Sequence, residues 1–311
     1  MPTSRSTSHG APFTAPSPDS ASVPDSAAAP APAPAPATAP NATPAPVRAY
    51  RSDLTLFMVI AFAVSWLSWG VAIALGGTET NEAANAPYVL GAFGPLVGAL
   101  VLRVRRRRRG EPVPEHVVSF RPAYLLKALL LLVLGSATVL AAALLASRAG
   151  GPELSLDVAK DAIDDFGGPA AFLVGMLVSG PLSEEPGWRG TAYPRLRQKL
   201  STFRVCLVLG VTWAVWHLPL FFIDGTVQHD LGLATPSGVL FVASNIPMAM
   251  LVTAAYERAG IVASIAVHFA VNATMILLAV EEPKVQAMIL GIQTLTVTAL
   301  LLTHRTGRRC S

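Results

Sequence analysis

Two adjacent glutamates and an arginine stand out in the stretch SEEPGWR, residues 183–189. Glu185 and Arg189 are four positions apart, so on a helix they share one face and can form an ion pair. Two histidines and an asparagine follow in equally apolar surroundings: His217, His268 and Asn272. Carboxylates and imidazoles can pass protons at a catalytic site or along a proton or ion relay. One glutamate and two histidines are also a ligand set of catalytic zinc, and Glu184, His217 and His268 are the candidate ligands if a metal is present.

The rest of the chain is unusually apolar. Apolar residues make up 52% of the sequence and charged residues 14%, whereas roughly 25% of the residues of a soluble domain are charged. This composition excludes an ordinary soluble protein and predicts an integral membrane protein. An ionisable side chain inside a membrane span is costly and persists mainly where it functions, so the polar residues above form a functional-site hypothesis.

The apolar runs predict an all-α fold, a polytopic bundle of about eight transmembrane helices between residues 51 and 305. Each run is long enough, or nearly so, for the ~20 residues that cross the hydrocarbon core. The expected spans are Leu54–Leu75, Pro87–Leu102, Ala123–Ser147, Pro169–Thr191, Val205–Ile223, Ser237–Tyr256, Ile261–Val280 and Val285–Thr303. Before them, residues 1–48 are rich in alternating alanine and proline, which cannot bury a core, so we expect a disordered cytoplasmic tail there.

The charges of the connections predict the orientation of the bundle. Lysine and arginine dominate the second and fourth connections and the C-terminal end, and acidic residues dominate the first, third and fifth. Cytoplasmic loops carry the excess of lysine and arginine, so both termini are expected in the cytoplasm. The run RVRRRRRG, residues 103–110, is then a topology signal that can also contact anionic lipid, and no nucleic-acid partner is expected.

Helix geometry allows the polar residues to meet. With a rise of ~1.5 Å per residue, Glu184 lies about 22 Å from the outer end of its span, and His217 and His268 lie about 18 and 10 Å from the cytoplasmic ends of theirs. Pro186 and Pro219 can break their helices, and broken helices at membrane depth tend to line a water-containing cavity. We therefore expect one site, in a membrane cavity that opens toward the cytoplasmic side.

Each residue taken alone also has a purely structural explanation. Glu185 and Arg189 can be an ion pair that locks one span, and a single buried histidine often only bonds a neighbouring helix. Trp213, close to His217 in the sequence, is typical of packing or of the membrane interface. The presence of ionisable groups on three spans at compatible depths is what favours a shared site.

Three motifs in a fixed order resemble the CPBP family, the membrane proteins related to the type II CAAX prenyl endopeptidase and to bacteriocin-immunity proteins. They are EEPGWRG at 184–190, WAVWHLPLFF at 213–222 and HFAVNAT at 268–274. The family pattern has a paired glutamate followed by arginine after three residues, an aromatic residue four positions before a histidine, and a histidine followed by asparagine after three. Every position is filled here, and the resemblance covers about residues 169–276, which would be the catalytic core.

The resemblance implies an intramembrane endopeptidase that hydrolyses a peptide bond of a peptide or membrane-protein substrate. Peptide hydrolysis needs an activated water and donors for the oxyanion that forms on the carbonyl. The implied roles are water activation for Glu184, positioning of that water for His217, oxyanion stabilisation for His268 and Asn272, and support of the motif helix for Glu185 and Arg189.

Metal dependence stays open on these residues. CPBP family members are often called metalloproteases, and zinc suits two histidines and a glutamate. The sequence lacks the His-Glu-x-x-His helix typical of zinc proteases. Asn272, one turn from His268, is a poor zinc ligand but a useful hydrogen-bond donor, so we prefer a mechanism without metal.

Two other classes of function also fit the residue types. A transporter or channel could use the same glutamates and histidines as a relay, although no matching halves or paired broken segments are found in the sequence. A non-catalytic membrane protein, such as an immunity protein, could bind a peptide or partner with the same fold. No feature of the sequence identifies the substrate or indicates that it is prenylated.

Overall fold

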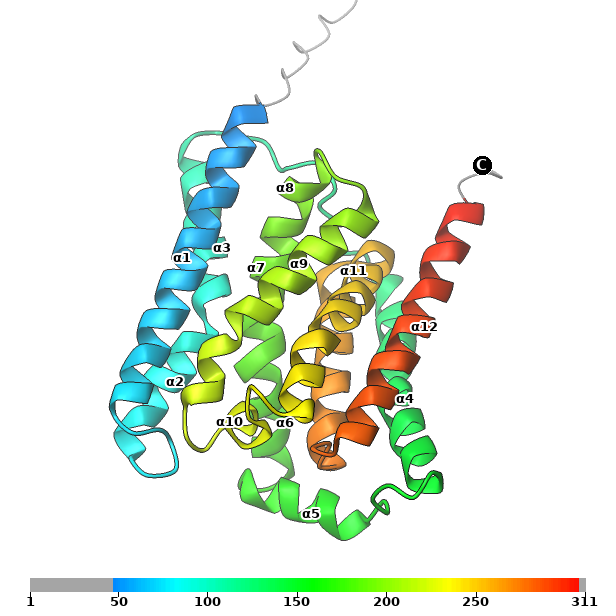
Figure 1. Cartoon of the computed structure of the whole chain (residues 1–311). Helices are drawn as coiled ribbons and strands as arrows, with labels where there is room; N and C mark the ends of the chain where they lie inside the picture. The colour runs from blue at the N-terminus through cyan, green and yellow to red at the C-terminus, as the bar shows by residue number, and fades with distance from the viewer. Residues whose placement is uncertain (1–46, 308–311) are drawn as a thin grey trace, which may run out of the picture. The chain divides into compact units, whose positions relative to one another are not determined.

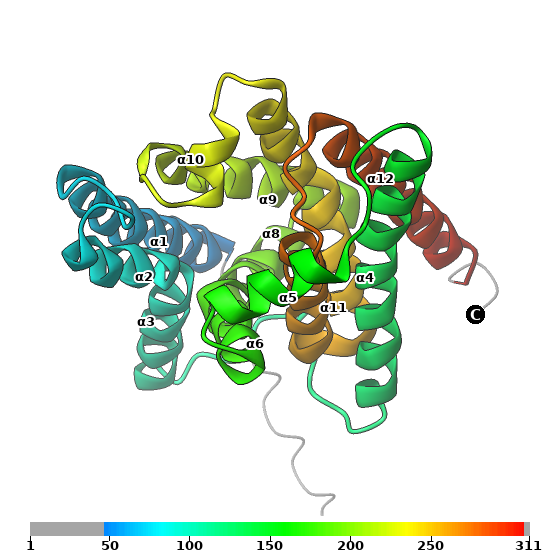
Figure 2. The ribbon, with the colours of Figure 1, turned by 90° about the horizontal axis from the view of Figure 1, so that it is seen from below.

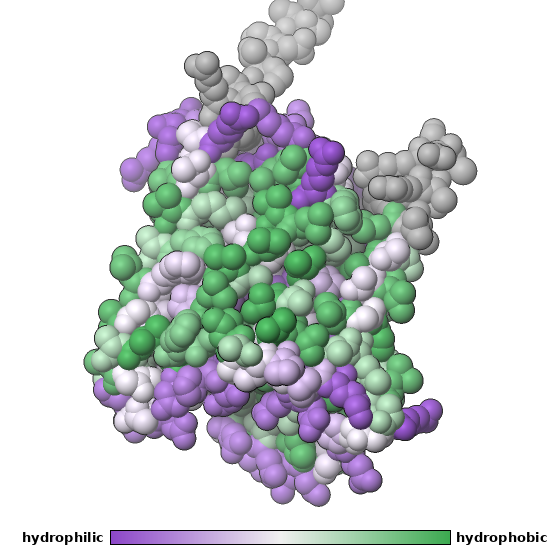
Figure 3. All heavy atoms as spheres, in the orientation of Figure 1, coloured by the Kyte–Doolittle hydropathy of each residue, from purple (hydrophilic) through white to green (hydrophobic). Residues whose placement is uncertain are grey.

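The computed structural model describes residues 47–307 (Figure 1). Within that range the secondary structure consists of helices and their connections, without a strand. Nearly all of the predicted tail at residues 1–48 lies outside the described residues. Figure 3 shows an apolar band between two hydrophilic ends on the visible face, as expected for a protein embedded in a bilayer.

Five helices are long and apolar enough to cross a membrane, or up to seven spans are present if each of two bent pairs counts as one. The five contain α1 (Val47–Ala74), α4 (Tyr124–Arg148), α9 (Thr202–Trp216), α11 (Pro236–Leu277) and α12 (Pro283–Gly307). The bent pairs join α2 (Asn85–Ala92) to α3 (Gly94–Arg108), and α5 (Leu156–Asp165) to the segment Pro169–Arg197. The polytopic all-α bundle is confirmed, whereas the number of eight spans stays a prediction.

The 42-residue helix α11 turns back on itself. A straight helix of this length would measure about 63 Å, yet the Ser237 hydroxyl near its start donates to the carbonyl of Glu281, just beyond its end, at 2.8 Å. The helical geometry is broken at Ala259 and Gly260. The two halves of α11 therefore run in opposite directions on either side of this break, as Figure 1 also shows.

The helix that carries the glutamate motif is interrupted repeatedly. It consists of α6 (Pro169–Leu177), a π-helical turn (Val178–Leu182), α7 (Ser183–Gly187), a second π turn (Trp188–Ala192) and α8 (Tyr193–Arg197). Pro181 and Pro186 lie inside these segments, and each lacks the N–H group that would bond to a carbonyl one turn earlier. Wide π turns absorb the interruption and are frequent at functional sites.

Basic and acidic connections lie at opposite ends of the bundle. α1 begins and α12 ends at the same end as the connections 109–123 and 198–201, which we call the basic end (Figure 1). The other end, the acidic end, carries residues 75–84, 149–168 and 223–235. There the Thr78 hydroxyl donates to the carbonyl of Asp224 at 3.1 Å, which ties the first acidic connection to the last.

Gly260 is the residue that permits α11 to reverse. Its φ of 74° and ψ of −163° fall in a region that only glycine populates readily. We expect Gly260→Ala to lower the free energy of unfolding by about 1–3 kcal/mol, because an alanine there is strained. Thermal unfolding of the purified protein in detergent measures this loss. Gly291→Ala on α12 is the matched control, since a Cβ atom there meets nothing within 4 Å; equal stability of both variants would refute the role of Gly260.

Candidate active site

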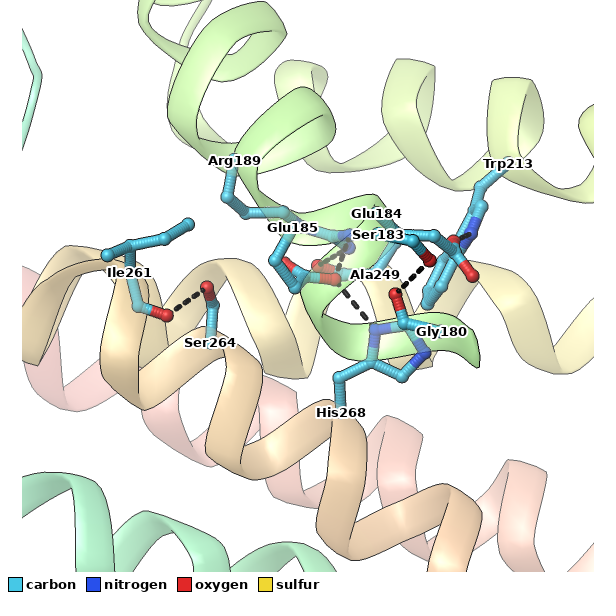
Figure 4. Close-up of polar contacts among 10 residues, drawn as sticks. All are labelled: Gly180, Ser183, Glu184, Glu185, Arg189, Trp213, Ala249, Ile261, Ser264 and His268. Atoms are coloured by element: carbon cyan, nitrogen blue, oxygen red, sulfur yellow. Dashed lines mark hydrogen bonds and ion pairs between the residues drawn. The ribbon is translucent and has the colours of Figure 1, made fainter. Parts of the chain in front are cut away.

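The six predicted site residues come from three parts of the bundle that pack together. Glu184, Glu185 and Arg189 are buried on the interrupted motif helix, with exposed fractions of 4%, 0% and 1%. His217 follows the last residue of α9, and His268 and Asn272 lie one turn apart on the second half of α11. Figure 4 shows the motif helix facing His268 on one side and Trp213 on the other.

Glu185 connects two of these elements through a single oxygen. Its Oε1 accepts from Arg189 Nη1 at 3.0 Å and lies 2.8 Å from His268 Nδ1. A carboxylate only accepts hydrogen bonds, so the proton of this pair belongs on Nδ1. His268 Nε2 is thereby left to face the cavity.

Arg189 is held on three sides. Besides its ion pair with Glu185, its Nη2 donates to the carbonyl of Ala249 on the first half of α11 at 3.3 Å. Its guanidinium lies 4.8 Å from the centre of the Trp213 ring, an attractive cation–π arrangement. Arg189 therefore joins the motif helix to α9 and α11 and compensates the charge of the buried carboxylate.

Glu184 points away from Glu185, toward Trp213 and the space beside Gly180. Its Oε2 accepts a hydrogen bond from the indole N–H of Trp213 at 2.5 Å. A Cβ atom placed on Gly180 would lie 3.6 Å from Glu184 Oε1, 3.5 Å from His268 Nε2 and 3.5 Å from Asn272 Nδ2. Three polar atoms from two helices therefore face one small space beside Gly180.

His217 lines the same cavity as His268 and Asn272. Its Nδ1 lies 2.8 Å from the carbonyl of Trp213, so that nitrogen carries a proton and donates. The ring centre is 5.6 Å from that of Trp213, whose ring centre is in turn 5.1 Å from that of His268. The indole of Trp213 thus packs against both imidazoles.

The sequence did not reveal two of the contributors to this site. The sequence position of Trp213 is typical of packing or of the membrane interface, but its indole N–H donates to one oxygen of Glu184. Gly180 was not singled out, although it leaves room beside three polar atoms. The only signals were the glycine-proline pair at 180–181 and the aromatic residue one turn before His217.

The three candidate zinc ligands, Glu184, His217 and His268, do not form a metal site. Among residues 47–307, no group of three or more histidine, cysteine, aspartate or glutamate side chains lies close enough to hold a metal ion. Glu184 Oε1 and His268 Nε2 face the space beside Gly180, and His217 lines the cavity, but the three side chains are not grouped as ligands of one ion. We therefore derive no step through a metal.

A cavity of about 600 Å³ connects the site with the acidic end. Its inner wall includes Trp213, His217, His268 and Asn272, and its outer wall includes Asp161 and Phe166 of the α5 region, Gln228 of α10 (Val227–Leu231) and Glu281. Figure 2 views the bundle from this end, with α5 and α10 nearest the viewer.

The position of the cavity shows at which end of the bundle it opens, although the side of the membrane that this end faces stays a prediction. The sequence predicts cytoplasmic arginine-rich connections and a cavity open toward the same side. The cavity instead reaches the acidic end, and the described residues that line it include none from the basic-end connections 109–123 and 198–201. If the arginine-rich connections are cytoplasmic, the cavity opens on the other side of the membrane, so only one of these two expectations can hold. Depth along a helix places a side chain in the bilayer but does not indicate at which end the surrounding helices separate.

Arg189 and Glu184 should differ in what their loss does to the fold. Arg189→Ala leaves the buried carboxylate of Glu185 without its cation, so we expect a loss of about 3–5 kcal/mol in the free energy of unfolding. Glu184→Gln keeps the shape and an acceptor for Trp213, so its thermal stability should stay near that of the native protein. Unfolding in detergent measures both, and equal losses would contradict the distinction between a supporting pair and a cavity-facing carboxylate.

Comparisons with known proteins agree with this geometry. Residues 166–274, which contain all six predicted site residues, match the family described as type II CAAX prenyl endopeptidase Rce1-like. The chain is also 24% identical, over 265 residues, to CAAX prenyl protease 2 of Methanococcus maripaludis, an alignment that covers 82% of this chain and 96% of that protein. The chain is thus similar to the type II CAAX prenyl endopeptidases, and this similarity supports a membrane-embedded protease.

Proposed function

We propose that the chain is an intramembrane endopeptidase in which Glu184 activates a water molecule for attack on a peptide bond. The observation that carries the proposal is the space beside Gly180, which Glu184 Oε1, His268 Nε2 and Asn272 Nδ2 all face. Hydrolysis of a peptide bond requires a base for the water and hydrogen-bond donors for the oxyanion, and the carboxylate and the two nitrogen atoms around this space can supply them. Similarity to a protease family supports this chemistry over a proton relay or a non-catalytic binder.

In the proposed reaction, Glu184 Oε1 takes a proton from the water, and the oxygen attacks the carbonyl carbon of the scissile bond. The carbonyl oxygen becomes an oxyanion that accepts hydrogen bonds from Asn272 Nδ2 and His268 Nε2. The C–N bond then breaks, and the proton held by Glu184 passes to the leaving amine. The products are a carboxylic acid and an amine, and Glu184 returns to its ionised form.

The neighbouring residues act on these three groups. The N–H of Trp213 fixes one oxygen of Glu184 and leaves the other as the base. Glu185 holds His268 through Nδ1, and the imidazolium form of this ring has a second N–H, at Nε2, for the oxyanion. Glu185 and Arg189 are thus positioning residues, and His217 orients the water or shares its proton from the cavity wall.

We further propose that the basic end faces the cytoplasm, with residues 1–48 on that side. The arginine-rich connections and both described ends of the chain share that end, as the excess of basic residues in cytoplasmic loops requires. The cavity then opens on the opposite side of the membrane, where the acidic connections lie. On this basis the substrate is a peptide or membrane-protein segment that approaches from the extracytoplasmic side.

The catalytic roles predict graded losses of activity. Glu184→Gln removes the base and should reduce turnover to background, whereas Asn272→Ala removes one oxyanion donor and should lower turnover roughly a hundredfold. Cleavage of a degenerate peptide library by the purified full-length protein, followed by mass spectrometry, measures both. Native-like turnover in Glu184→Gln would overturn the proposed mechanism.

Cysteine labelling can test the orientation. Two cysteine variants, Glu79→Cys at the acidic end and Arg109→Cys at the basic end, place exposed thiols at opposite ends of the bundle. In intact cells expressing a protein whose native cysteines are replaced by alanine, an impermeant maleimide should label position 79 and spare position 109. The reverse pattern would mean that the cavity opens to the cytoplasm.

A further inference from the structure

We propose that α12 carries a second binding surface for the substrate, formed by Gln286 and Gln293, which bonds to the main chain of an extended peptide. This inference rests on the proposed peptidase function and extends it beyond the motif residues. The matched family segment ends at residue 274, so both glutamines lie outside it.

Both side chains are buried in the cavity wall and incompletely bonded. Gln286 and Gln293 are 3% and 1% exposed, and with Ile289 they form one face of α12 that lines the cavity. Gln286 Nε2 donates to the carbonyl of Glu281 at 3.2 Å. Its Oε1, and the Nε2 of Gln293, have no hydrogen-bond partner in the part of the chain that the structure describes.

Two threonines on the same stretch of α12 behave differently. Thr294 donates to the carbonyl of Leu290 at 2.6 Å, and Thr298 donates to the carbonyl of Thr294 at 2.7 Å. Both threonines are on the exposed side and are satisfied within the helix. A buried amide group without a partner destabilises the fold, so the two glutamines are best explained by a ligand that supplies the missing bonds.

The chemistry of the wall indicates which ligand fits. The free atoms are one neutral acceptor and one neutral donor, the partners that the N–H and C=O groups of a peptide need. Seven residues of helix separate the two side chains by about 10.5 Å, and three residues of extended chain cover nearly the same distance. Between them lies Ile289, and Met275 and Ile276 of α11 line the same cavity, which favours apolar side chains in the substrate.

The position of the pair suggests the path of the peptide. Gln286 is bonded to Glu281 at the acidic end, and Gln293 lies two turns further inward along α12. A peptide that enters from the acidic end would thus meet Gln286 first and Gln293 next, on its way to the space beside Gly180. The glutamines would hold the chain, and Glu184 would act on it.

Kinetics on the full-length protein can test the pair. The variants are Gln286→Leu and Gln293→Leu, with Thr294→Val as the matched control on the exposed side of the same helix. The substrate is the library peptide that the native protein cleaves fastest. We expect each leucine variant to raise KM about tenfold, the effect of one lost hydrogen bond, with kcat within about twofold. The thermal midpoint of Gln293→Leu should be unchanged or higher, because an unsatisfied amide N–H is removed, and Thr294→Val should match the native protein.

Two results would overturn the proposal. One is a KM within about twofold of the native value in both leucine variants. The other is a thermal midpoint that falls together with activity, since that would make the glutamines structural.

A binding measurement separates this proposal from that of the peptidase mechanism. The same peptide library is passed over immobilised Glu184→Gln protein and over the double variant Glu184→Gln/Gln293→Leu, and the retained peptides are identified by mass spectrometry. Retention that depends on Gln293 supports the binding surface even if the native protein cleaves no peptide, a result that would defeat only the mechanism. Equal retention by both proteins, or no retention by either, refutes the binding surface.

Discussion

The buried carboxylate of Glu185 is the constraint on which the site depends. A charge without water is tolerated only when it is paired, and Glu185 has Arg189 on its own helix and His268 on α11 as partners. Arg189 in turn bonds to the main chain of the other half of α11 and lies over Trp213. One charge thus fixes the relative positions of three elements. Glu184, the preceding residue on the motif helix, is thereby directed at the space beside Gly180.

The geometry of the interrupted motif helix explains how two adjacent glutamates have different partners. Successive residues on a helix point about 100° apart, so Glu184 and Glu185 cannot face the same partner. The π turns on either side of α7, with Pro181 in the first turn and Pro186 in α7, leave backbone groups that a regular helix would have bonded. A glycine fits beside the site at one of these turns, which brings main chain and polar side chains close together. The irregular backbone is buried in protein, where a bilayer-spanning chain can accommodate it.

The sequence predicted the local relationships well and the tertiary ones only in part. The four-residue spacing of Glu185 and Arg189 predicted their ion pair, and apolar runs predicted helices at the expected places. The pairing of Glu185 with His268 joins residues 83 positions apart and was not predicted. The bond of Trp213 to Glu184 depends on the rotation of α9, and the cavity opening depends on how helix ends separate. Neither quantity is encoded in periodicity or spacing.

The i,i+4 placement of the central ion pair also bears on how the protein is made. The motif helix leaves the ribosome before α11, so His268 and the carbonyl of Ala249 do not yet exist when Glu185 must enter the membrane. Arg189 lies one turn away on the same helix and can neutralise Glu185 without any other part of the fold. The ion pair therefore makes the centre of the motif helix electrically neutral while this helix is in the bilayer without α11. When α11 has been inserted, its residues pack against the motif helix and complete the site.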